Sequence, residues 1–321
     1  MLWYYVALIF ITSCLILSWL SSRLVKNLIN IAKYLNWREF IIAFFVMAFA
    51  ASLPNLFVDL NAALNNMPEL AFGDIMGGNL VDLTVVMAVA VLFCRTNIKA
   101  NSKMVQMSAI FSVVIAVMPM LLVLDGRLDR IDGALLIILF FIYSFWLFSN
   151  EDRFKKVYSH NSKKPIENFA GFIKSLFGII FLLVLLLLAS QAVVSSAKYF
   201  SEKLNISLSL VGILIVGLGN CFPEAYFSIV SARRSQNWMV LGDLMGSIIV
   251  CATLVLGLIA LVAPFEISDF SPFFIARIFL IIASLLFLLF IRTGKKITKK
   301  EGLVLLLVYV AFLLTEIFFS A

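Results

Sequence analysis

Several acidic and amide side chains lie inside long apolar runs of this 321-residue sequence. Asp82 and Glu224 are the deepest acids within their runs, and Asp59 follows Asn55 by four residues, which places both on one face of a helix. A carboxylate at the centre of a bilayer is unfavourable unless it faces water, a partner or an ion. Oxygen groups of this kind are ligands for hard cations. These residues therefore predict a cation site inside a membrane, and a hydrogen-bonded structural acid is the alternative for each of them.

Two of the polar runs also contain a proline, Pro54 in one and Pro223 in the other. Proline inside a membrane helix frees the backbone carbonyl one turn earlier, and local unwinding exposes further carbonyls. Gly217 and Gly219 precede the second proline and would ease such a break. We therefore expect interrupted helices at both prolines, with carbonyl oxygens beside the polar side chains.

The composition is that of a membrane protein. Hydrophobic residues make up 63% of the chain and charged residues 13%, and the mean hydropathy is +1.08, whereas roughly 25% of the residues in a soluble domain are charged. Apolar runs long enough to cross about 30 Å of hydrocarbon predict an all-α integral membrane protein with ten transmembrane helices. The predicted spans are residues 2–20, 39–64, 70–94, 105–124, 133–149, 170–197, 206–232, 238–263, 272–291 and 302–319.

Lys and Arg are distributed unequally between the two sets of loops. The loops after the first, third, fifth, seventh and ninth spans carry 19 of them, whereas the N-terminus and the remaining interior loops carry 4. Because basic loops stay in the cytoplasm, we expect both termini outside the cell membrane and a cytoplasmic central linker. No basic residue precedes the first apolar run, which favours a retained span over a signal peptide. The net charge of +7 is therefore a topology signal and does not indicate nucleic-acid binding.

Two parts of the chain resemble each other at a constant offset of 169 residues. The segment AASLPNLFVDL at 50–60 corresponds to GNCFPEAYFSI at 219–229, and FGDIMGGNLVDLT at 72–84 corresponds to LGDLMGSIIVCAT at 241–253. Chance similarity between apolar segments does not explain a register that holds over more than eighty residues.

Each copy holds five predicted spans, an odd number, so the second copy must enter the membrane inverted. We therefore expect two inverted-topology five-helix repeats, residues 1–149 and 170–321, joined by the linker 150–169. This architecture is typical of transporters that bind their substrate near the midplane, where the two copies meet. A duplication with only structural consequences is the alternative.

Glycine pairs open the third and eighth spans, with Gly73 and Gly77 in the first copy. The GxxxG spacing lets helices approach closely, so we expect these glycines to be packing residues. Asp74 and Asp243 lie near the span entrances, where they are interpreted either as structural helix-start caps or as outer charges that recruit cations.

These motifs resemble those of the cation/Ca2+ exchanger superfamily, sodium/calcium exchanger type. The family pattern is G-[ST]-S-x-P-E followed by G-N-x-x-G-S-N-x-x-N. Here the first copy reads AASLPN and GDIMGGNLVD, and the second reads GNCFPE and GDLMGSIIVC. The likeness covers nearly the whole chain. It implies a secondary-active cation antiporter that works by alternating access at a midplane carboxylate site.

The resemblance also implies a central ligand set. In such exchangers it comprises a glutamate after each motif proline and an Asn or Asp near the end of each second motif. Here those positions are Asn55, Asp82, Glu224 and Cys251. Glu224 is retained, whereas the first copy has an amide and an acid with their places exchanged. Cys251 replaces an oxygen ligand with a thiol, a poor partner for Ca2+.

Flanking sodium sites in the family use side chains from both motifs. Ser52, Asn220 and Ser247 match one of these sites, and Asp59, which is absent from the family pattern, would supply a compensating charge. The other flanking site is eroded, because its positions hold Ala51, Gly78 and Cys221. The expected cation-binding residues are Asp82, Glu224, Asn55, Ser52, Asp59, Asn220, Ser247 and Cys251, with Glu224 and Asp82 as the metal ligands.

Three transport mechanisms fit these residues. Ca2+ is exchanged for Na+, or it is exchanged for H+, since burial favours the neutral form of a carboxyl group. In the third, a divergent cation/proton antiporter has lost selectivity for Ca2+. A membrane protein without transport activity is a further alternative.

An enzyme is not expected. A thiol nucleophile needs a nearby base, and the single histidine, His160, belongs to the predicted linker. All four cysteines fall within predicted spans and show neither a disulfide framework nor a metal-binding spacing. We expect no cofactor apart from the transported Ca2+ and Na+ or H+. The expected partners are inorganic cations and the lipid bilayer, without an obligate protein partner.

Overall fold

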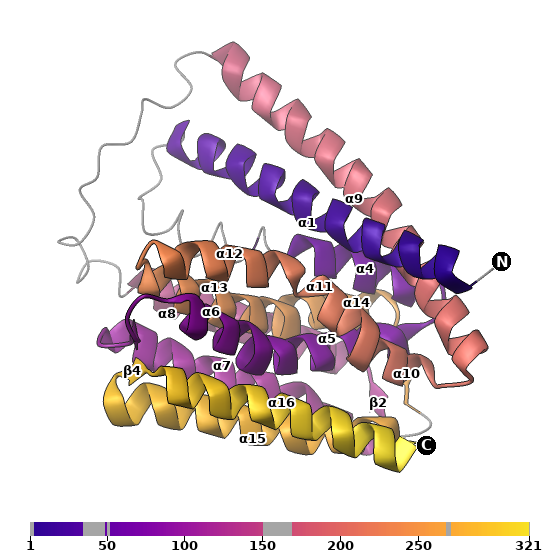
Figure 1. Cartoon of the computed structure of the whole chain (residues 1–321). Helices are drawn as coiled ribbons and strands as arrows, with labels where there is room; N and C mark the ends of the chain where they lie inside the picture. The colour runs from indigo at the N-terminus through magenta and orange to yellow at the C-terminus, as the bar shows by residue number, and fades with distance from the viewer. Residues whose placement is uncertain (1–2, 35–48, 50–51, 150–168, 268–270, 321) are drawn as a thin grey trace.

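A computed structural model of the chain describes residues 3–34, 49, 52–149, 169–267 and 271–320 (Figure 1). Helices dominate the described part of the first half. Its elements are α1 (Trp3–Tyr34), α4 (Leu53–Leu64), α5 (Pro68–Val81), the π-helical segment η2 (Asp82–Val86), α6 (Met87–Phe93), β1 (Ile98–Lys99), α7 (Lys103–Leu122), the 3-10 turn η3 (Val123–Asp125), β2 (Arg127–Leu128) and α8 (Arg130–Ser149).

Helices also dominate the described part of the second half. Its described elements are α9 (Phe169–Leu204), α10 (Leu208–Val211), the π-helical segment η5 (Gly212–Val216), α11 (Gly217–Asn220), α12 (Phe222–Arg233), α13 (Asn237–Ile249), the π-helical segment η6 (Val250–Val255), α14 (Leu256–Val262), β3 (Phe265–Glu266), α15 (Ser271–Gly294), β4 (Lys296–Ile297) and α16 (Lys299–Ser320).

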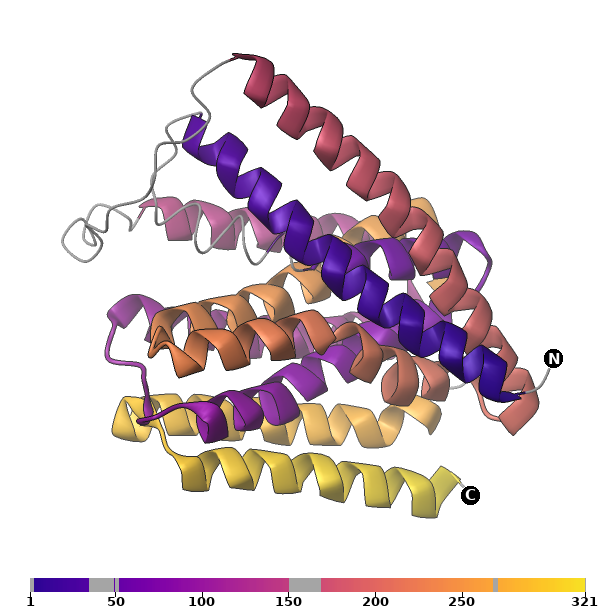
Figure 2. The ribbon, with the colours of Figure 1, turned by 45° about the horizontal axis from the view of Figure 1, so that its top comes forward.

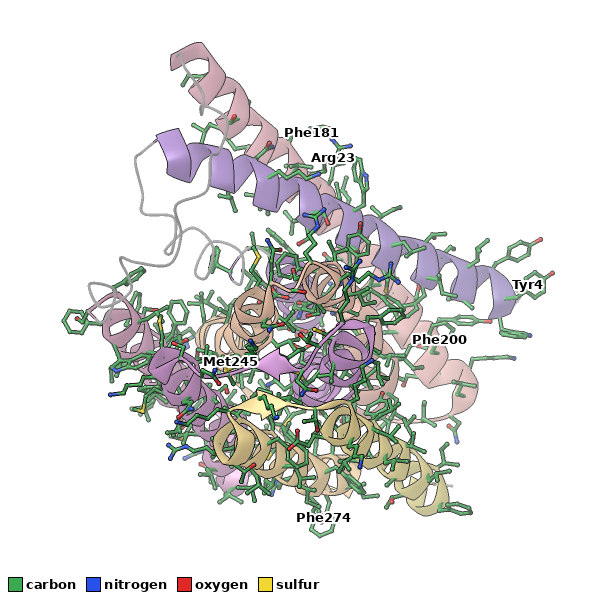
Figure 3. All side chains as sticks on the ribbon, turned by 60° about the vertical axis from the view of Figure 1, so that its left-hand side comes forward. Tyr4, Arg23, Phe181, Phe200, Met245 and Phe274 are labelled. Carbon is green, nitrogen blue, oxygen red and sulfur yellow. The ribbon has the colours of Figure 1, made fainter. Side chains whose placement is uncertain are left out.

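Nine helical stretches of the described chain are long and apolar enough to cross a bilayer, which confirms a mostly helical membrane fold. They correspond to nine of the ten predicted spans. The remaining prediction, residues 39–64, lies partly outside the described residues, and only α4 is seen from it. Large apolar side chains such as Tyr4, Phe181 and Phe274 extend outward from the bundle, whereas Met245 is fully buried (Figure 3).

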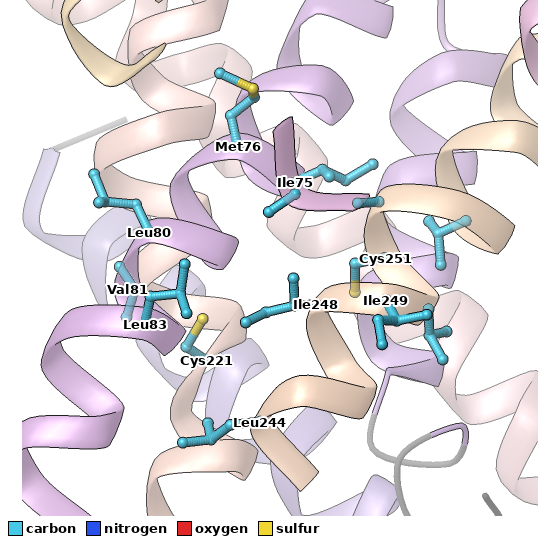
Figure 4. Packing of buried hydrophobic residues seen from close by; sticks show 14 of the residues in the cluster. Ile75, Met76, Leu80, Val81, Leu83, Cys221, Leu244, Ile248, Ile249 and Cys251 are labelled. Atoms are coloured by element: carbon cyan, nitrogen blue, oxygen red, sulfur yellow. The ribbon is translucent and has the colours of Figure 1, made fainter. Parts of the chain in front are cut away.

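Burial separates central helices from peripheral ones. In the most apolar 18-residue segments of Pro68–Phe93 and Met239–Val262, 83% and 78% of the residues are buried. In the corresponding segments of Ser175–Leu204 and Lys299–Phe318, the buried share is 28% each. The spans that carry the two glycine pairs therefore form the centre of the bundle. At this centre, apolar side chains such as Ile75, Leu83 and Ile248 pack together. Cys221 and Cys251 belong to the same buried cluster (Figure 4).

Backbone contact between α5 and η5 explains the first glycine pair. A methyl group added at Gly73 would meet the backbone of Ser209 and Gly212, and one added at Gly77 would meet the backbone of Ile213. Only glycine allows two helices to approach this closely. The expected packing role of Gly73 and Gly77 is therefore confirmed.

Two antiparallel pairs of two-residue strands, β1 with β4 and β2 with β3, join the loops of the two halves. Strands this short were not predicted. The helices that follow β2 and β4 both begin with a side chain that caps the first turn. At α8 the Asp129 carboxylate accepts hydrogen bonds from the backbone N–H groups of Ile131 and Asp132. At α16 Thr298 and Glu301 form a reciprocal capping box.

The long helices α1 and α9 pack against each other at one side of the bundle and run at a slant to the remaining helices (Figures 1 and 2). They contact the centre through α4, α11 and α12. One such contact is at Gly219, where an added methyl group would meet the Cys14 sulfur and the Phe10 ring. The beginning of α1 and the end of α16 lie at the same end of the bundle.

Candidate functional site

The predicted cation-binding residues converge between α4, the α5–η2 helix, the α11–α12 junction and the α13–η6 helix. Each of them is at most 8% exposed, and Asp59 and Glu224 are fully buried. Buried polar groups need hydrogen bonds, because an unpaired group loses its hydration without compensation. The partners of each side chain therefore decide what the cluster can bind.

Three of these side chains form a chain of hydrogen bonds between the two halves. The Ser52 hydroxyl donates to the Ser247 hydroxyl at 3.5 Å, and the Ser247 hydroxyl donates to Oε1 of Glu224 at 3.4 Å. The second oxygen of Glu224, Oε2, is buried and receives no hydrogen bond from the described residues. One oxygen of this carboxylate is therefore held in place while the other remains available.

Asp82 provides a second available carboxylate oxygen. It begins the π-helical segment η2 and lies beside Cys221 and Ser247, and its Oδ1 atom is buried without a hydrogen-bond partner among the described residues. The Cys221 thiol donates to the carbonyl of Gly78 at 3.5 Å. Asp82 and Glu224 are close enough to repel each other when both are charged. A bound cation would relieve this repulsion.

The two positions that depart most from the exchanger pattern contact each other. Nδ2 of Asn55 donates to the Cys251 sulfur at 3.5 Å. Oδ1 of Asn55 is buried and has no hydrogen-bond partner in the described part of the chain. The Oδ1 atom of Asn55 is therefore available as an oxygen ligand, while its amide nitrogen is bound to Cys251.

A small cavity lies among these side chains, mainly on the side of the first half. Its volume open to the centre of a water-sized particle is about 10 Å³, which is the room that one water molecule needs. A single inorganic cation without its hydration shell is no larger than a water molecule, so the cavity has room for one such ion. The lining residues are Asn55, Asp59, Asp74, Ile75, Gly78, Asn79, Asp82 and Cys251. The expected common face of Asn55 and Asp59 is therefore confirmed.

Asp74 and Asp243 differ from their predicted positions at span entrances. Both are at most 5% exposed, and the residues before α5 and α13 are Met67 and Gln236, so neither acid is the N-cap of its helix. Asp74 instead accepts a hydrogen bond from Nδ2 of Asn220 at 2.5 Å. The predicted cap and outer recruitment roles are wrong, because close helix packing covers even the second turn of these helices.

The break expected in the second proline-containing run is present and short. The helix is interrupted at Cys221, and α12 resumes with Pro223 in its first turn. In the first copy, α4 begins at Leu53 with Pro54 in its first turn, but the preceding residues 50–51 lie outside the described chain.

Wider helical turns in the central spans were missed by sequence reasoning. The π-helical segments η2 and η6 contain Asp82 and Cys251, and π-helical turns are frequent at functional sites. In each of them a threonine hydroxyl bonds the carbonyl four residues earlier, from Thr84 to Leu80 and from Thr253 to Ile249. Such bonds bend helices. The matched threonines 169 residues apart were the available signal.

A purely acidic or thiol metal site is not found. Within the described ranges, no three His, Cys, Asp or Glu side chains are grouped so that they could hold a metal ion. A cation bound here would therefore take a mixed set of ligands, in which carboxylate oxygens are joined by amide and hydroxyl oxygens.

Comparison with known proteins assigns the chain to a family. A sequence model of the sodium/calcium exchanger protein family matches residues 5–149 and 174–318. The sodium/calcium exchanger MaX1 of Methanosarcina acetivorans is 26% identical, and the match covers 91% of this chain and 93% of that protein. The membrane protein MJ0091 of Methanocaldococcus jannaschii is 27% identical, with 94% of each chain covered.

Solved structures give the same result. The sodium-calcium exchanger NCX_Mj, in crystals soaked with 100 mM Na+ and 10 mM Sr2+, matches this fold with a TM-score of 0.66 and 26% identity. The match covers 97% of this chain and 98% of that one. With the family match over both halves, the buried carboxylates and the shared fold, this chain belongs to the sodium/calcium exchanger family of membrane cation antiporters.

Proposed function

We propose that this antiporter exchanges Ca2+ for Na+ or H+ by alternating access, and that Asp82 and Glu224 hold the cargo cation. The observation that carries the proposal is the pair of buried carboxylates, one from each half, each with an oxygen that receives no hydrogen bond from the described residues. Two carboxylates supply a charge of −2. This charge is balanced by one Ca2+, or by two monovalent ions on the return step.

The depth of these residues supports a site near the bilayer midplane. Asp82 is the 15th of the 26 residues in the apolar stretch Pro68–Phe93, and Glu224 is the 17th of the 26 in Leu208–Arg233. A cation held there is about equally far from both membrane surfaces. Alternating access requires such a position.

Inverted repeats would supply the two halves that exchange roles. The two matched ranges of the family model begin at residues 5 and 174, which are 169 apart. Several backbone features recur at this offset. Asn66 and Ser235 both have a φ of 58°, and Thr84 and Thr253 make the same hydrogen bond within a π-helical segment. These correspondences support five-helix repeats over 1–149 and 170–321.

The strand pairs support the alternating order of the loops. The loops after the third and ninth spans are joined by β1 and β4, and those after the fourth and eighth spans are joined by β2 and β3. Each pair therefore joins two loops on the same predicted side of the membrane. Together with the 19-to-4 distribution of basic residues, this favours a cytoplasmic linker at 150–169 and both termini outside.

The slanted pair α1 and α9 is the part of the protein that would move during alternating access. These helices pack mainly against each other, and they touch the site helices through fewer contacts, one of which is at Gly219. Sliding of this pair across α4 and α12 would open one side of the site and close the other. The central helices would keep the carboxylates in place.

A second candidate is a cation/proton antiporter without selectivity for Ca2+. The contact between Asn55 and Cys251 favours this candidate, because an amide stands here in place of the family's carboxylate and a thiol in place of an oxygen ligand. A site with fewer charged oxygens binds divalent cations more weakly. The relative CaxA of Alkalimonas amylolytica, 25% identical, carries the broader name of putative antiporter.

Ion flux in reconstituted vesicles tests the proposal. The full chain is placed in liposomes, and uptake of radiolabelled Ca2+ is measured with an outward Na+ gradient and, separately, with a pH gradient. We expect uptake with at least one gradient and none in protein-free liposomes. Uptake with neither gradient would contradict Ca2+ exchange, and proton-driven uptake of another cation would then favour the second candidate.

A further inference from the structure

Exposed basic side chains gather at one end of the bundle, where the loops after α6, α12 and α15 meet. The strand pair β1–β4 joins two of these loops, and α12 packs against α6. Arg233, at the end of α12, lies over the Phe93 ring of α6, with its Cζ atom 4.8 Å from the ring centroid. The exposed basic residues at these loops form a patch that we call the basic end: Arg95, Lys99, Lys103, Arg233, Arg234, Arg292, Lys295, Lys296, Lys299 and Lys300.

Little negative charge accompanies the basic end. Within the described segments that form it, 94–103, 231–237 and 291–301, Glu301 is the single acidic residue. Its carboxylate is already engaged, because it accepts hydrogen bonds from the backbone N–H and the hydroxyl of Thr298. The sequence of the predicted linker contains five basic and three acidic residues, so it adds no net negative charge. The patch is therefore strongly positive.

Two lysines face each other within the strand pair of this patch. Lys99 of β1 is the direct cross-strand partner of Lys296 of β4, and both side chains are exposed. Like charges in this position destabilise a strand pair. At the opposite end of the bundle, Arg127 of β2 lies directly across from Glu266 of β3, and such opposite charges favour pairing (Figure 1). An anion from outside the chain would compensate β1–β4, whereas β2–β3 already contains both signs of charge.

The basic end lies where the apolar surface of the bundle stops. Leu92 and Phe93, at the end of α6, are exposed, and so are Leu303 and Val304 near the start of α16. Exposed apolar side chains of a membrane protein face the hydrocarbon of the bilayer. The basic side chains a few residues away therefore lie at the level of the lipid headgroups. Topology requires basic loops, but it does not require two lysines opposite each other in a strand pair.

We propose that the basic end binds the headgroups of anionic phospholipids, and that a lipid phosphate between Lys99 and Lys296 stabilises the strand pair that joins the two halves. Basic clusters at the ends of membrane spans attract anionic lipids. A lipid fits better than a soluble polyanion, because the patch borders the apolar surface and its phosphate partner must lie at the same depth. This surface goes beyond the proposed ion exchange, since none of its residues belongs to the cation site.

Thermal unfolding of the purified full chain with added lipid tests this surface. The protein is measured in a neutral detergent that contains phosphatidylglycerol or, at the same concentration, phosphatidylcholine with the same acyl chains. We expect phosphatidylglycerol to raise the Tm by at least about 5 °C relative to phosphatidylcholine. Sodium phosphate at the same concentration should leave the Tm unchanged, because a free phosphate ion lacks the acyl chains that hold a lipid at this surface.

Lys296→Glu is the decisive variant, because it converts the like-charge pair of β1–β4 into the arrangement of β2–β3. It should raise the Tm in phosphatidylcholine by about 2 °C, and it should reduce the gain from phosphatidylglycerol by at least about half. Lys99→Gln removes the repulsion without adding a charge, so its gain should also fall. Lys198→Glu is the matched control, because Lys198 is exposed on α9 outside the basic end. This control should keep the wild-type gain.

Four results would overturn the lipid surface. The first is an equal Tm of the wild type with phosphatidylglycerol and phosphatidylcholine, and the second is the same gain from sodium phosphate alone. The third is an unchanged gain in both Lys296→Glu and Lys99→Gln. The fourth is an equal loss of the gain in Lys198→Glu, which would mean that the net charge of the protein attracts the lipid instead of this patch.

Discussion

Gly77 is the position at which the packing of the bundle centre can be tested most sharply. A Cβ atom there would lie 2.7 Å from Cα and 2.8 Å from the carbonyl carbon of Ile213. These neighbours are backbone atoms of η5 and cannot rotate away as a flexible side chain would. Overpacking destabilises by about 1–3 kcal/mol, and we expect Gly77→Ala to reach the upper end, about 3 kcal/mol.

Gly78→Ala is the matched control, one residue along the same helix. Its added methyl group would meet the Cys221 sulfur at 3.7 Å and the Gly217 carbonyl oxygen at 4.0 Å, which are ordinary contact distances. We expect a change in stability of less than about 0.5 kcal/mol, typical of a substitution without steric conflict. The comparison therefore separates the effect of close helix approach from the general effect of replacing glycine.

Thermal unfolding of the purified protein in detergent measures the difference. At roughly 2–4 °C per kcal/mol, the value for folded domains of 150–250 residues, Gly77→Ala should lower the Tm by about 6 °C or more. Gly78→Ala should stay within about 2 °C of the wild type. Equal Tm values for the two variants would refute the close contact between α5 and η5.

Three further predictions follow from the site, the helix ends and the topology. Asn55→Glu restores a charged oxygen ligand beside Cys251. It should lower the Ca2+ concentration for half-maximal uptake by about tenfold, equivalent to about 1.4 kcal/mol. An effect of the same size in Asn55→Gln would contradict a role for charge. Glu301→Ala removes the capping box of α16 and should destabilise by about 1 kcal/mol, measured by thermal unfolding with Lys300→Ala as the control. Ser159→Cys in the central linker should react with a membrane-impermeant maleimide only after the cells are opened, because the linker is predicted to be cytoplasmic. The four native cysteines are buried and should not contribute to the labelling. Labelling of intact cells would place the linker outside.

Much of the fold could be predicted because membrane spans depend on a simple property, the length of an apolar run. The site residues could be identified for a similar reason, since polar groups such as Asn55 and Glu224 are conspicuous within such runs. Spacing alone was enough to place Asn55 and Asp59 on one face, because helix geometry fixes which residues are neighbours.

Depth and local helix geometry could not be predicted in the same way. Asp74 lies only six residues from the start of α5, yet it is buried because glycines bring η5 against that end of the helix. Linear distance from a helix end does not report such tertiary contacts. The π-helical segment at Asp82 lies within packed helices and contains the Thr84 hydroxyl bonded to the Leu80 carbonyl, and the length of an apolar run does not report such a local change of helix geometry.

The central claim is that the Asp82 and Glu224 carboxylates hold the transported cation. The most direct test is Ca2+ uptake into vesicles that contain wild-type protein, Glu224→Gln or Asp82→Asn, reconstituted at equal density and compared under the gradient that drives the wild type. Both substitutions keep the shape of the side chain and remove its charge. We expect each to reduce the initial rate by at least about 30-fold, because a buried charge that faces the ion is lost. Uptake at the wild-type rate in either variant would contradict the assignment of that residue as a ligand.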